Sequence, residues 1–238
     1  MNPNCQRLKD RFYAGSKHPY QIYEDTVKRV LRKDCIVVDI GCGYEAPDLH
    51  KISRLGLAKM LIGLDLVTFT GNGSAVVTLI RNDVSRISLK NDLANMVISK
   101  SVLEHLGDPQ RVFKEVHRIL EKKGKFIILT PNKYDYSSII AKIIPNAFHA
   151  YIVSKVAGRN VGDVFHTFFL ANTYSSIKRF AVNSGFKIIT FEYIGQYPAY
   201  LTLSPVLFLL GTFYDKLICK YNCLRQFRGW ILAVLEKE

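Results

Sequence analysis

The stretch Val37-Val38-Asp39-Ile40-Gly41-Cys42-Gly43 decides the fold of this 238-residue chain. Residues 35–40 form a short apolar run rich in β-branched side chains, which predicts a buried strand. The glycines after it permit a tight turn, and they allow backbone amides to approach a bound ligand where a side chain would collide. We therefore predict a strand that ends in a ligand-binding loop.

On both sides of this loop, short apolar runs alternate with longer amphipathic stretches, as in a mostly parallel sheet covered by helices. The length and the 48% apolar composition suit one α/β domain. Strands are predicted over 35–40, 60–66, 75–80, 96–99, 126–130, 186–192 and 230–235. Helices are predicted over 20–33, 48–58, 109–120 and 174–183, with Asn172 as the candidate N-cap of the last one.

Acidic side chains follow the second and third predicted strands. Asp65, which precedes Leu66, stands near the end of the second strand, where a carboxylate can accept hydrogen bonds from both hydroxyls of a ribose. Asp83 follows the third strand. Because ligands of an open parallel sheet bind outside the carboxyl ends of its strands, we expect these side chains near the glycine loop.

The order of these features, followed by Ser99-Lys100-Ser101-Val102-Leu103-Glu104-His105-Leu106, closely resembles the class I S-adenosylmethionine-dependent methyltransferases. It is most similar to the type 11-like group, which has a Val-Leu-Glu-His segment after the fourth strand. The resemblance covers about residues 35–132. It implies a Rossmann-like, mostly parallel seven-stranded sheet with helices on both faces, and S-adenosylmethionine as the cofactor.

The resemblance also implies a cofactor role for residues at the strand ends. The glycine loop would face the methionine part, the second strand end the ribose, the third strand end the adenine, and the fourth the other side of the cofactor. The resemblance assigns Asp39, Gly41, Cys42 and Gly43 to the methionine part, and Asp65 and Leu66 to the ribose. It assigns Asp83 and Val84 to the adenine, and Ser99, Lys100 and Ser101 to the other side of the cofactor.

The loop departs from the family pattern at one position, because Glu45 stands where a further glycine is common. The fit of that loop also leaves another enzyme class open. A dinucleotide-binding oxidoreductase carries Gly-x-Gly-x-x-Gly or its alanine variant, and Ala46 fits the variant. A nicotinamide enzyme therefore remains an alternative, although the Glu104-His105 segment and the later strands suit it poorly.

Two histidines are candidate general bases, because an imidazole tuned near neutral pH can deprotonate a hydroxyl acceptor. His105 follows the fourth strand, and His166 belongs to the segment inserted after the fifth. Some relatives hold a divalent ion with a Glu-x-x-Glu-His segment, but Ser101 occupies the position of the first Glu here. The remaining ligands are too few, so we predict no metal.

Two irregular segments, 132–172 and 195–228, follow strands that should end at the cofactor edge, so we expect them to cap the active site. The domain would then comprise an N-terminal helical segment (1–34), a cofactor-binding half (35–131) and the two caps. Residues 193–214 contain no charged side chain, although prolines and glycines interrupt them. They suit a buried cap or a peripheral membrane contact better than a transmembrane span.

The net charge of +13 raises the question of nucleic-acid binding. The surplus forms no long basic run and accompanies no nucleic-acid-binding motif, so a solvated basic face or an attraction to an anionic membrane explains it better. The N-terminus lacks the apolar core of a secretion signal, and the five scattered cysteines suit a reducing compartment. We therefore predict a cytoplasmic protein, with a peripheral position at the inner membrane face as an option.

These observations predict an S-adenosylmethionine-dependent methyltransferase that acts on oxygen of a small-molecule or lipid-like acceptor. Two alternatives remain. The basic surplus favours an RNA methyltransferase, although no Asn-Pro-Pro-Tyr-like segment follows the fourth strand. Glu45 in the glycine loop keeps open a non-catalytic scaffold of the same fold at the membrane surface.

Overall fold

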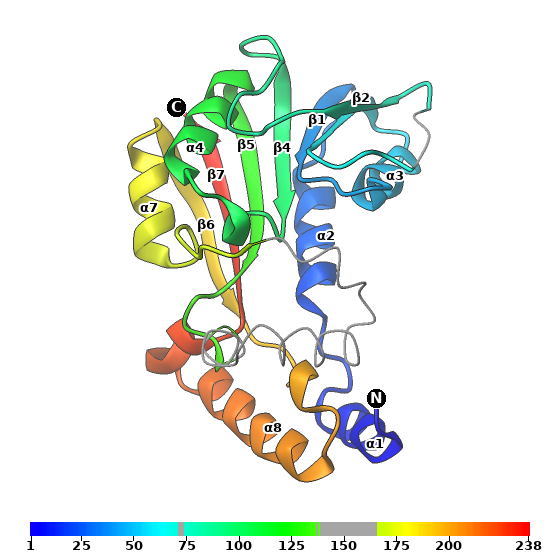
Figure 1. Ribbon diagram of the computed structural model, residues 1–238, viewed down its shortest axis with the longest axis vertical. Helices are drawn as coiled ribbons and strands as arrows, with labels where there is room; N and C mark the ends of the chain where they lie inside the picture. The colour runs from blue at the N-terminus through cyan, green and yellow to red at the C-terminus, as the bar shows by residue number, and fades with distance from the viewer. Residues whose placement is uncertain (71–73, 137, 139–165) are drawn as a thin grey trace. The chain divides into compact units, whose positions relative to one another are not determined.

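The computed structural model describes residues 1–70, 74–136, 138 and 166–238 (Figure 1). The described α-helices are α1 (Pro3–Phe12), α2 (Pro19–Val30), α3 (Pro47–Ser53), α4 (Pro109–Ile119), α7 (Tyr174–Val182) and α8 (Pro205–Lys220). Short 3-10 helices are η1 (Leu103–His105), η3 (Ala199–Leu201) and η4 (Asn222–Phe227). The described strands are β1 (Cys35–Ile40), β2 (Ala58–Asp65), β3 (Val77–Arg81), β4 (Ala94–Lys100), β5 (Leu120–Pro131), β6 (Phe186–Ile194) and β7 (Trp230–Lys237).

The strands form one seven-stranded sheet in the order β3-β2-β1-β4-β5-β7-β6. β1 pairs in parallel with β2 and β4, and the parallel pairing continues to β3 on one side and β5 on the other. β7 runs antiparallel to its neighbours, since Lys125 of β5 pairs with Glu236 near the end of β7, and the Glu238 amide donates to the Gly185 carbonyl before β6. This confirms the predicted mostly parallel, Rossmann-like sheet.

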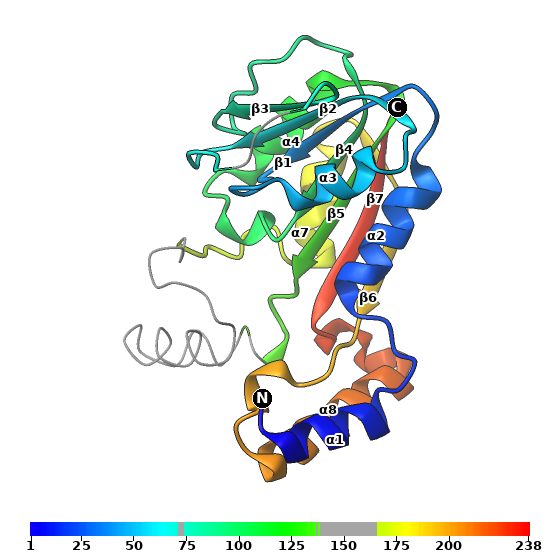
Figure 2. The same ribbon diagram turned by 90° about the vertical axis from the view of Figure 1, so that its right-hand side faces the viewer.

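Helices cover both faces of this sheet, with α2 and α3 on one face and α4 and α7 on the other (Figure 2). On the α4 and α7 face, the ring of Phe113 packs against Phe126 of β5, with centroids 5.6 Å apart, and against Phe180 of α7 at 5.8 Å. Phe186 of β6 joins the same cluster. Buried aromatic rings of this kind contribute heavily to the free energy of folding, so the cluster fixes both helices on the sheet.

Contacts divide the chain into two compact units. Unit 1 comprises Met1–Ile22, Pro131–His166 and Tyr193–Trp230, and unit 2 comprises Tyr23–Thr130, Thr167–Glu192 and Ile231–Glu238. Nearly all of the predicted cofactor-binding half, 35–131, belongs to unit 2. Unit 1 takes in the N-terminal residues and most of both predicted caps, and residues 139–165 of the first cap lie outside the described residues.

Helix α2 ends at Val30 instead of residue 33, and two other helix predictions also need correction. α3 ends at Ser53 instead of residue 58, because the chain turns at Gly56, whose φ of +64° is left-handed. The N-cap of α7 is Thr173, whose hydroxyl accepts from the Ser176 amide at 3.2 Å and completes a capping box. Asn172 therefore does not cap this helix, which corrects the predicted assignment; its side chain is engaged elsewhere.

Strand β5 is also longer than predicted. It begins at Leu120 instead of residue 126 and includes Gly124. A Cβ at Gly124 would lie 2.8 Å from the Glu121 carbonyl oxygen, so the close backbone approach at this point requires glycine. Gly124, where the sequence suggests a turn, is therefore part of the strand.

In unit 1, α1 and α8 lie side by side (Figures 1 and 2). The Asn2 amide before α1 donates to the Thr202 carbonyl over 3.2 Å. Arg228 holds the end of α8, since its guanidinium donates to the carbonyls of Ile218 at 3.2 Å and Cys219 at 3.1 Å. Among the described residues, no helix combines the length and the apolar character that crossing a bilayer requires.

Candidate cofactor site and catalytic residues

The glycine loop after β1 has the backbone that its sequence predicts. Gly41 and Gly43 have left-handed φ angles of +73° and +74°. A Cβ on Gly41 would lie 2.2 Å from Cγ2 of Val102, so the loop packs directly against the segment that follows β4. Around Gly43 the added Cβ would meet nothing within 4 Å, which leaves that side of the loop open.

Asp65, at the end of β2, holds this loop. Its Oδ2 accepts a hydrogen bond from the Gly43 amide at 2.8 Å, and its Oδ1 accepts from the amides of Leu66 and Val67 at 2.7 and 3.2 Å. Each carboxylate oxygen can accept more than one hydrogen bond, so capacity remains for a ligand. The adjacent Leu66 side chain is 58% exposed, as an apolar contact for a ligand would be.

The end of β3 joins the same edge, since the Asn82 amide donates to the Asp65 carbonyl at 2.8 Å. Asp83 is exposed, and its Oδ1 accepts from the Ser85 amide at 2.8 Å. Val84 between them is half-buried. The Asn82 side-chain oxygen is buried and has no hydrogen-bond partner among the described residues. The structure therefore brings the predicted ribose and adenine residues together at one edge of unit 2.

Asp39 is almost fully buried below the glycine loop, with 3% of its surface exposed. Burial raises the pKa of its carboxyl well above the ordinary value, the nearby Asp48 carboxylate adds to the rise, and the Lys100 ammonium opposes it. Lys100 lies 2.7 Å from both carboxylate oxygens of Asp48, in the first turn of α3. The Lys100 side chain thus binds α3 to the end of β4.

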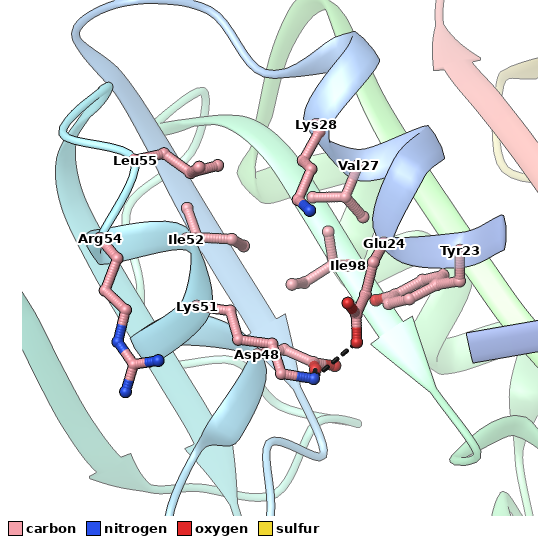
Figure 3. A pocket seen from close by; sticks show the side chains of 10 residues that line it. All are labelled: Tyr23, Glu24, Val27, Lys28, Asp48, Lys51, Ile52, Arg54, Leu55 and Ile98. Atoms are coloured by element: carbon pink, nitrogen blue, oxygen red, sulfur yellow. Dashed lines mark hydrogen bonds and ion pairs between the residues drawn. The ribbon is translucent and has the colours of Figure 1, made fainter. Parts of the chain in front are cut away.

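Asp48 also borders a pocket of about 250 Å³ between α2 and α3 (Figure 3). Apolar side chains of both helices and Ile98 of β4 line it, and the Lys51 ammonium meets the Glu24 carboxylate at 2.5 Å. Tyr23 points from α2 toward Asp48 in the figure. Burial, followed by the nearby Asp39 and Asp48 carboxylates, raises the pKa of Tyr23, so this phenol keeps its proton.

The remaining predicted cofactor residues are placed as follows. Ser99 is fully buried, and its hydroxyl has no hydrogen-bond partner among the described residues. Ser101 has a left-handed φ of +59°, and its amide donates to the Leu129 carbonyl at 2.8 Å. Cys42 is buried with its Sγ 2.7 Å from the position of a Cβ on Gly63, so its side chain packs behind the loop. Burial, with the nearby Asp39 and Asp65 carboxylates, raises the pKa of the Cys42 thiol, which disfavours a reactive thiolate.

A second polar network follows β4 and β5. Glu104 is buried, and its Oε2 accepts from the Thr130 hydroxyl at 3.0 Å, while Thr130 in turn accepts from the Asn172 amide at 2.6 Å. The Glu104 carbonyl accepts from the amide of Phe168 at 2.7 Å, which ties the residues before α7 to η1. His105 follows, with 31% of its side chain exposed and its Nε2 3.9 Å from Glu104 Oε1.

The second candidate base, His166, is exposed and belongs to unit 1, whereas His105 belongs to unit 2. Its catalytic role stays a prediction. Among residues 1–70, 74–136, 138 and 166–238, no group of three or more His, Cys, Asp or Glu side chains is arranged to hold a metal ion.

Comparison with known protein families indicates which kind of domain the sequence contains. Residues 38–128, from β1 into β5, match the family model described as a methyltransferase domain. These residues belong to a methyltransferase domain that resembles the class I, S-adenosylmethionine-dependent kind. The match spans the glycine loop, Asp65, Asp83 and Glu104-His105, which are the residues that suggested the family. The nicotinamide alternative is therefore not retained, and the residues of this methyltransferase can be compared with the needs of its cofactor.

The methyltransferase is similar to a Mycolicibacterium smegmatis protein named as a probable S-adenosylmethionine-dependent methyltransferase, at 25% identity over 134 residues, or 55% of this chain and 50% of that protein. It is also similar to an uncharacterised protein of Methanocaldococcus jannaschii, at 25% identity over 179 residues, or 75% of this chain and 66% of that one. The alignments thus span less than two thirds of either relative.

Among solved structures, a methyltransferase from Mesorhizobium loti aligns with a TM-score of 0.60 and 19% identity, covering 94% of this chain and 99% of that one. A geranyl diphosphate C-methyltransferase from Streptomyces coelicolor aligns with a TM-score of 0.58 and 11% identity, covering 92% and 79%. These likenesses establish the fold.

The residues at the sheet edge fit S-adenosylmethionine. The open space beside Gly43 admits a ligand, and the buried Asn82 Oδ1 and Ser99 Oγ are polar atoms that lack a partner among the described residues. Glu45, the departure from the family loop, is exposed and does not adopt a left-handed φ. Ala46 does so instead, at +44°, so a glycine at position 45 is not required by the backbone.

Four residues around the site were not singled out from the sequence: Tyr23, Asp48, Thr130 and Asn172. Asp48 carried a usable signal, because an acidic residue just after Pro47 suits the first turn of a helix at the cofactor edge. Asn172 was noticed only as a cap. Tyr23 lies in an amphipathic stretch that indicated a helix, and Thr130 ends an apolar stretch that indicated a strand.

Proposed function

We propose that this methyltransferase transfers a methyl group to a hydroxyl oxygen of a small-molecule or lipid-linked acceptor, with His105 as the general base. The observation that carries the proposal is the pairing of His105 with Glu104, at 3.9 Å between Nε2 and Oε1. When bound, S-adenosylmethionine supplies an electrophilic methyl group on a sulfonium sulfur. A hydroxyl acceptor must lose its proton as it reacts, and an imidazole can take that proton near neutral pH.

Glu104 suits the task of orienting His105. Its carboxylate is buried and is held by the Thr130 hydroxyl, which Asn172 positions in turn. A fixed carboxylate next to an imidazole can hold the ring in one orientation, which suits proton removal from an acceptor. His105 is partly exposed, as a group that contacts an acceptor needs to be.

His105 is also close in the chain to the loop that would hold the methyl donor. Val102, three residues earlier, makes the contact that keeps Gly41 without a side chain. Methyl transfer depends mainly on holding the acceptor and the methyl group in line, so a base on the segment adjoining the glycine loop is well suited to the reaction.

The acceptor class rests on composition. Residues 193–214, which begin at the end of β6, contain no charged side chain. A pocket for a lipid-linked or other apolar acceptor is lined mainly by uncharged, apolar side chains. Specificity within one fold is carried by the site and its surrounding segments, so unit 1 is where we expect the acceptor to be recognised. His166 remains a second candidate base there.

The test is a methylation assay of cell extract with the methyl-labelled cofactor, followed by separation into lipid, small-molecule, protein and nucleic-acid fractions. Label is expected in the lipid or small-molecule fraction and in a product with an oxygen-bound methyl group. Label confined to the nucleic-acid fraction would support an RNA methyltransferase instead, and the absence of label from every fraction would contradict methyl transfer.

His105→Gln then tests the base. We expect kcat to fall by about 10²–10⁴-fold, with cofactor affinity unchanged, and the pH dependence of kcat near neutrality to disappear. His117→Gln is the matched control, since His117 lies on α4, on the face of the sheet opposite α2 and α3, and should leave kcat unchanged. A His105→Gln enzyme with normal kcat and a normal pH profile would exclude His105 as the base.

A further inference from the structure

Helix α8 of unit 1 has two distinct faces. One is buried and comprises Phe208, Gly211, Thr212, Asp215 and Ile218. The opposite face, which we call the outer face, comprises Val206, Leu210, Phe213 and Leu217, spaced four, three and four residues apart. These side chains are exposed by 66%, 63%, 71% and 38%.

A helix face turned toward water normally carries polar side chains. The outer face has none, and the exposed Leu203 and Leu209 extend it on either side. A contiguous exposed apolar surface of this kind usually marks a binding surface in a soluble domain. Among the described residues of unit 1, this surface is exposed and is available to a partner.

Positive charge borders the outer face. Lys216 and Lys220 are exposed on α8, and their ammonium groups lie 4.3 Å from the ring centroid of Tyr13 and 5.5 Å from that of Tyr221. Lysines and tyrosines with an apolar body and a polar end are typical of the boundary between lipid and water. The partner must therefore tolerate both apolar contact and cations.

The net charge of the other parts of unit 1 is also positive. Residues 1–22 and 193–230 each contain four Lys or Arg and one Asp. The Asp in the second segment, Asp215, is buried, so the exposed charge of that segment is entirely basic. Arg7 and Arg11 are exposed on α1, which lies beside α8. A negatively charged partner surface would be attracted to both helices.

We propose that the outer face of α8 docks on an anionic membrane surface, with Lys216 and Lys220 near the lipid headgroups. α8 has 16 residues, which suits a helix lying in the plane of the interface. A second copy of the chain is a poorer partner, because pairing two outer faces would bring the four lysines together. This proposal does not depend on the proposed acceptor or on His105.

The test is co-sedimentation of the full chain with vesicles of phosphatidylcholine alone or mixed with phosphatidylglycerol. We expect binding to the mixed vesicles at low salt and weaker binding at high salt. The double variant Leu210→Ser/Phe213→Ser should lose more than about tenfold in affinity, because both side chains would enter the lipid interface. Lys216→Gln/Lys220→Gln should lose about tenfold for the mixed vesicles only.

Val182→Ser/Ile189→Ser is the matched control, since these apolar residues are 60% and 47% exposed but belong to unit 2. It should bind as the unaltered chain does. Wild type that remains in the supernatant with anionic vesicles at low salt would overturn the proposal. So would wild-type affinity in the Leu210→Ser/Phe213→Ser variant, or competition by inorganic phosphate beyond the effect of its ionic strength.

Two further measurements separate the remaining explanations. A concentration-dependent dimer that Leu210→Ser/Phe213→Ser abolishes, without vesicle binding by wild type, would identify a second copy as the partner and reject the membrane. Thermal unfolding of each variant checks folding. If the serine variant proves unstable, the lysine variant still tests the proposal, since equal binding to both vesicle types would contradict it.

Discussion

The Oδ2 atom of Asp65 accepts a hydrogen bond from the amide of Gly43 at 2.8 Å. The end of β2 thereby fixes the glycine loop that follows β1, even though the two residues lie on different strands. The Asp65 carboxylate therefore positions the loop, and we predict that it also binds the ribose of the cofactor.

Asp65→Ala should weaken binding of S-adenosylmethionine and S-adenosylhomocysteine by roughly 1–3 kcal/mol, because hydrogen bonds to a carboxylate are lost. Isothermal titration calorimetry measures the change. Asp10→Ala is the control, since Asp10 is exposed on α1 and its Oδ1 accepts a hydrogen bond from the Gln6 side chain. Equal affinity for Asp65→Ala and wild type would remove the ribose assignment.

Gly41→Ala should destabilise the fold through both its backbone and its contact with Val102. A left-handed φ costs an alanine about 1–2 kcal/mol, and the new Cβ would overlap Val102 Cγ2. In urea unfolding, Gly41→Ala/Val102→Ala should recover part of the loss. Gly56→Ala provides the backbone cost alone, because nothing lies within 4 Å of its Cβ position. The contact is unimportant if Gly41→Ala and Gly56→Ala lose the same stability.

Lys100→Met should lower the free energy of unfolding by about 3 kcal/mol, because it leaves the buried Asp48 carboxylate without its nearer cation and only Lys51, 4.0 Å away, remains. Asp48→Asn added to Lys100→Met removes the stranded charge and should restore most of the loss. A double-mutant cycle in urea measures this coupling. If the two substitutions prove additive, the ion pair does not hold α3 to β4.

The raised pKa of Asp39 gives stability a definite pH dependence. The unfolded chain releases this proton near the ordinary value of 3.8, whereas the folded chain keeps it to a higher pH. Between the two values the folded state binds more protons, so the contribution of Asp39 to stability is lost as pH rises through that window. Asp39→Asn should therefore gain stability relative to wild type as pH rises above the ordinary value of 3.8.

Urea unfolding at several pH values measures that difference. Asp34→Asn, which alters an exposed carboxylate in the turn before β1, is the control and should differ from wild type by a nearly constant amount. A constant difference for Asp39→Asn as well would contradict the buried, protonated carboxyl.

The sequence predicted the sheet well because its strands are short apolar runs punctuated by glycine or proline. β1 has the predicted bounds, and the last strand was recognised from residues 230–235 alone. Boundaries failed where a longer-range contact outweighed the local signal. Asn172 looks like a helix cap, but its amide is used by Thr130, 42 residues away in sequence, and the neighbouring Thr173 caps the helix.

In the candidate site, too, residues with a local signal were predictable and long-range partners were not. Gly41, Gly43 and Asp65 were predictable because each stands at a strand end, where an open parallel sheet binds its ligands. The partner of Lys100 was not, since Asp48 lies 52 residues away and nothing in either segment selects the other. The sequence suggested that Lys100 lines the cofactor, and the structure adds that its charge is shared with the first turn of α3.

The place of β7 has a consequence for how the protein is made. β7 is the last strand in sequence, yet it lies between β5 and β6 in the sheet. During translation, β5 and β6 therefore cannot pair with β7 until residues 230–237 have left the ribosome. Until then both present unpaired strand edges, which are prone to aggregation. The nascent protein should thus be most prone to aggregation in the interval between the synthesis of β6 and the docking of β7.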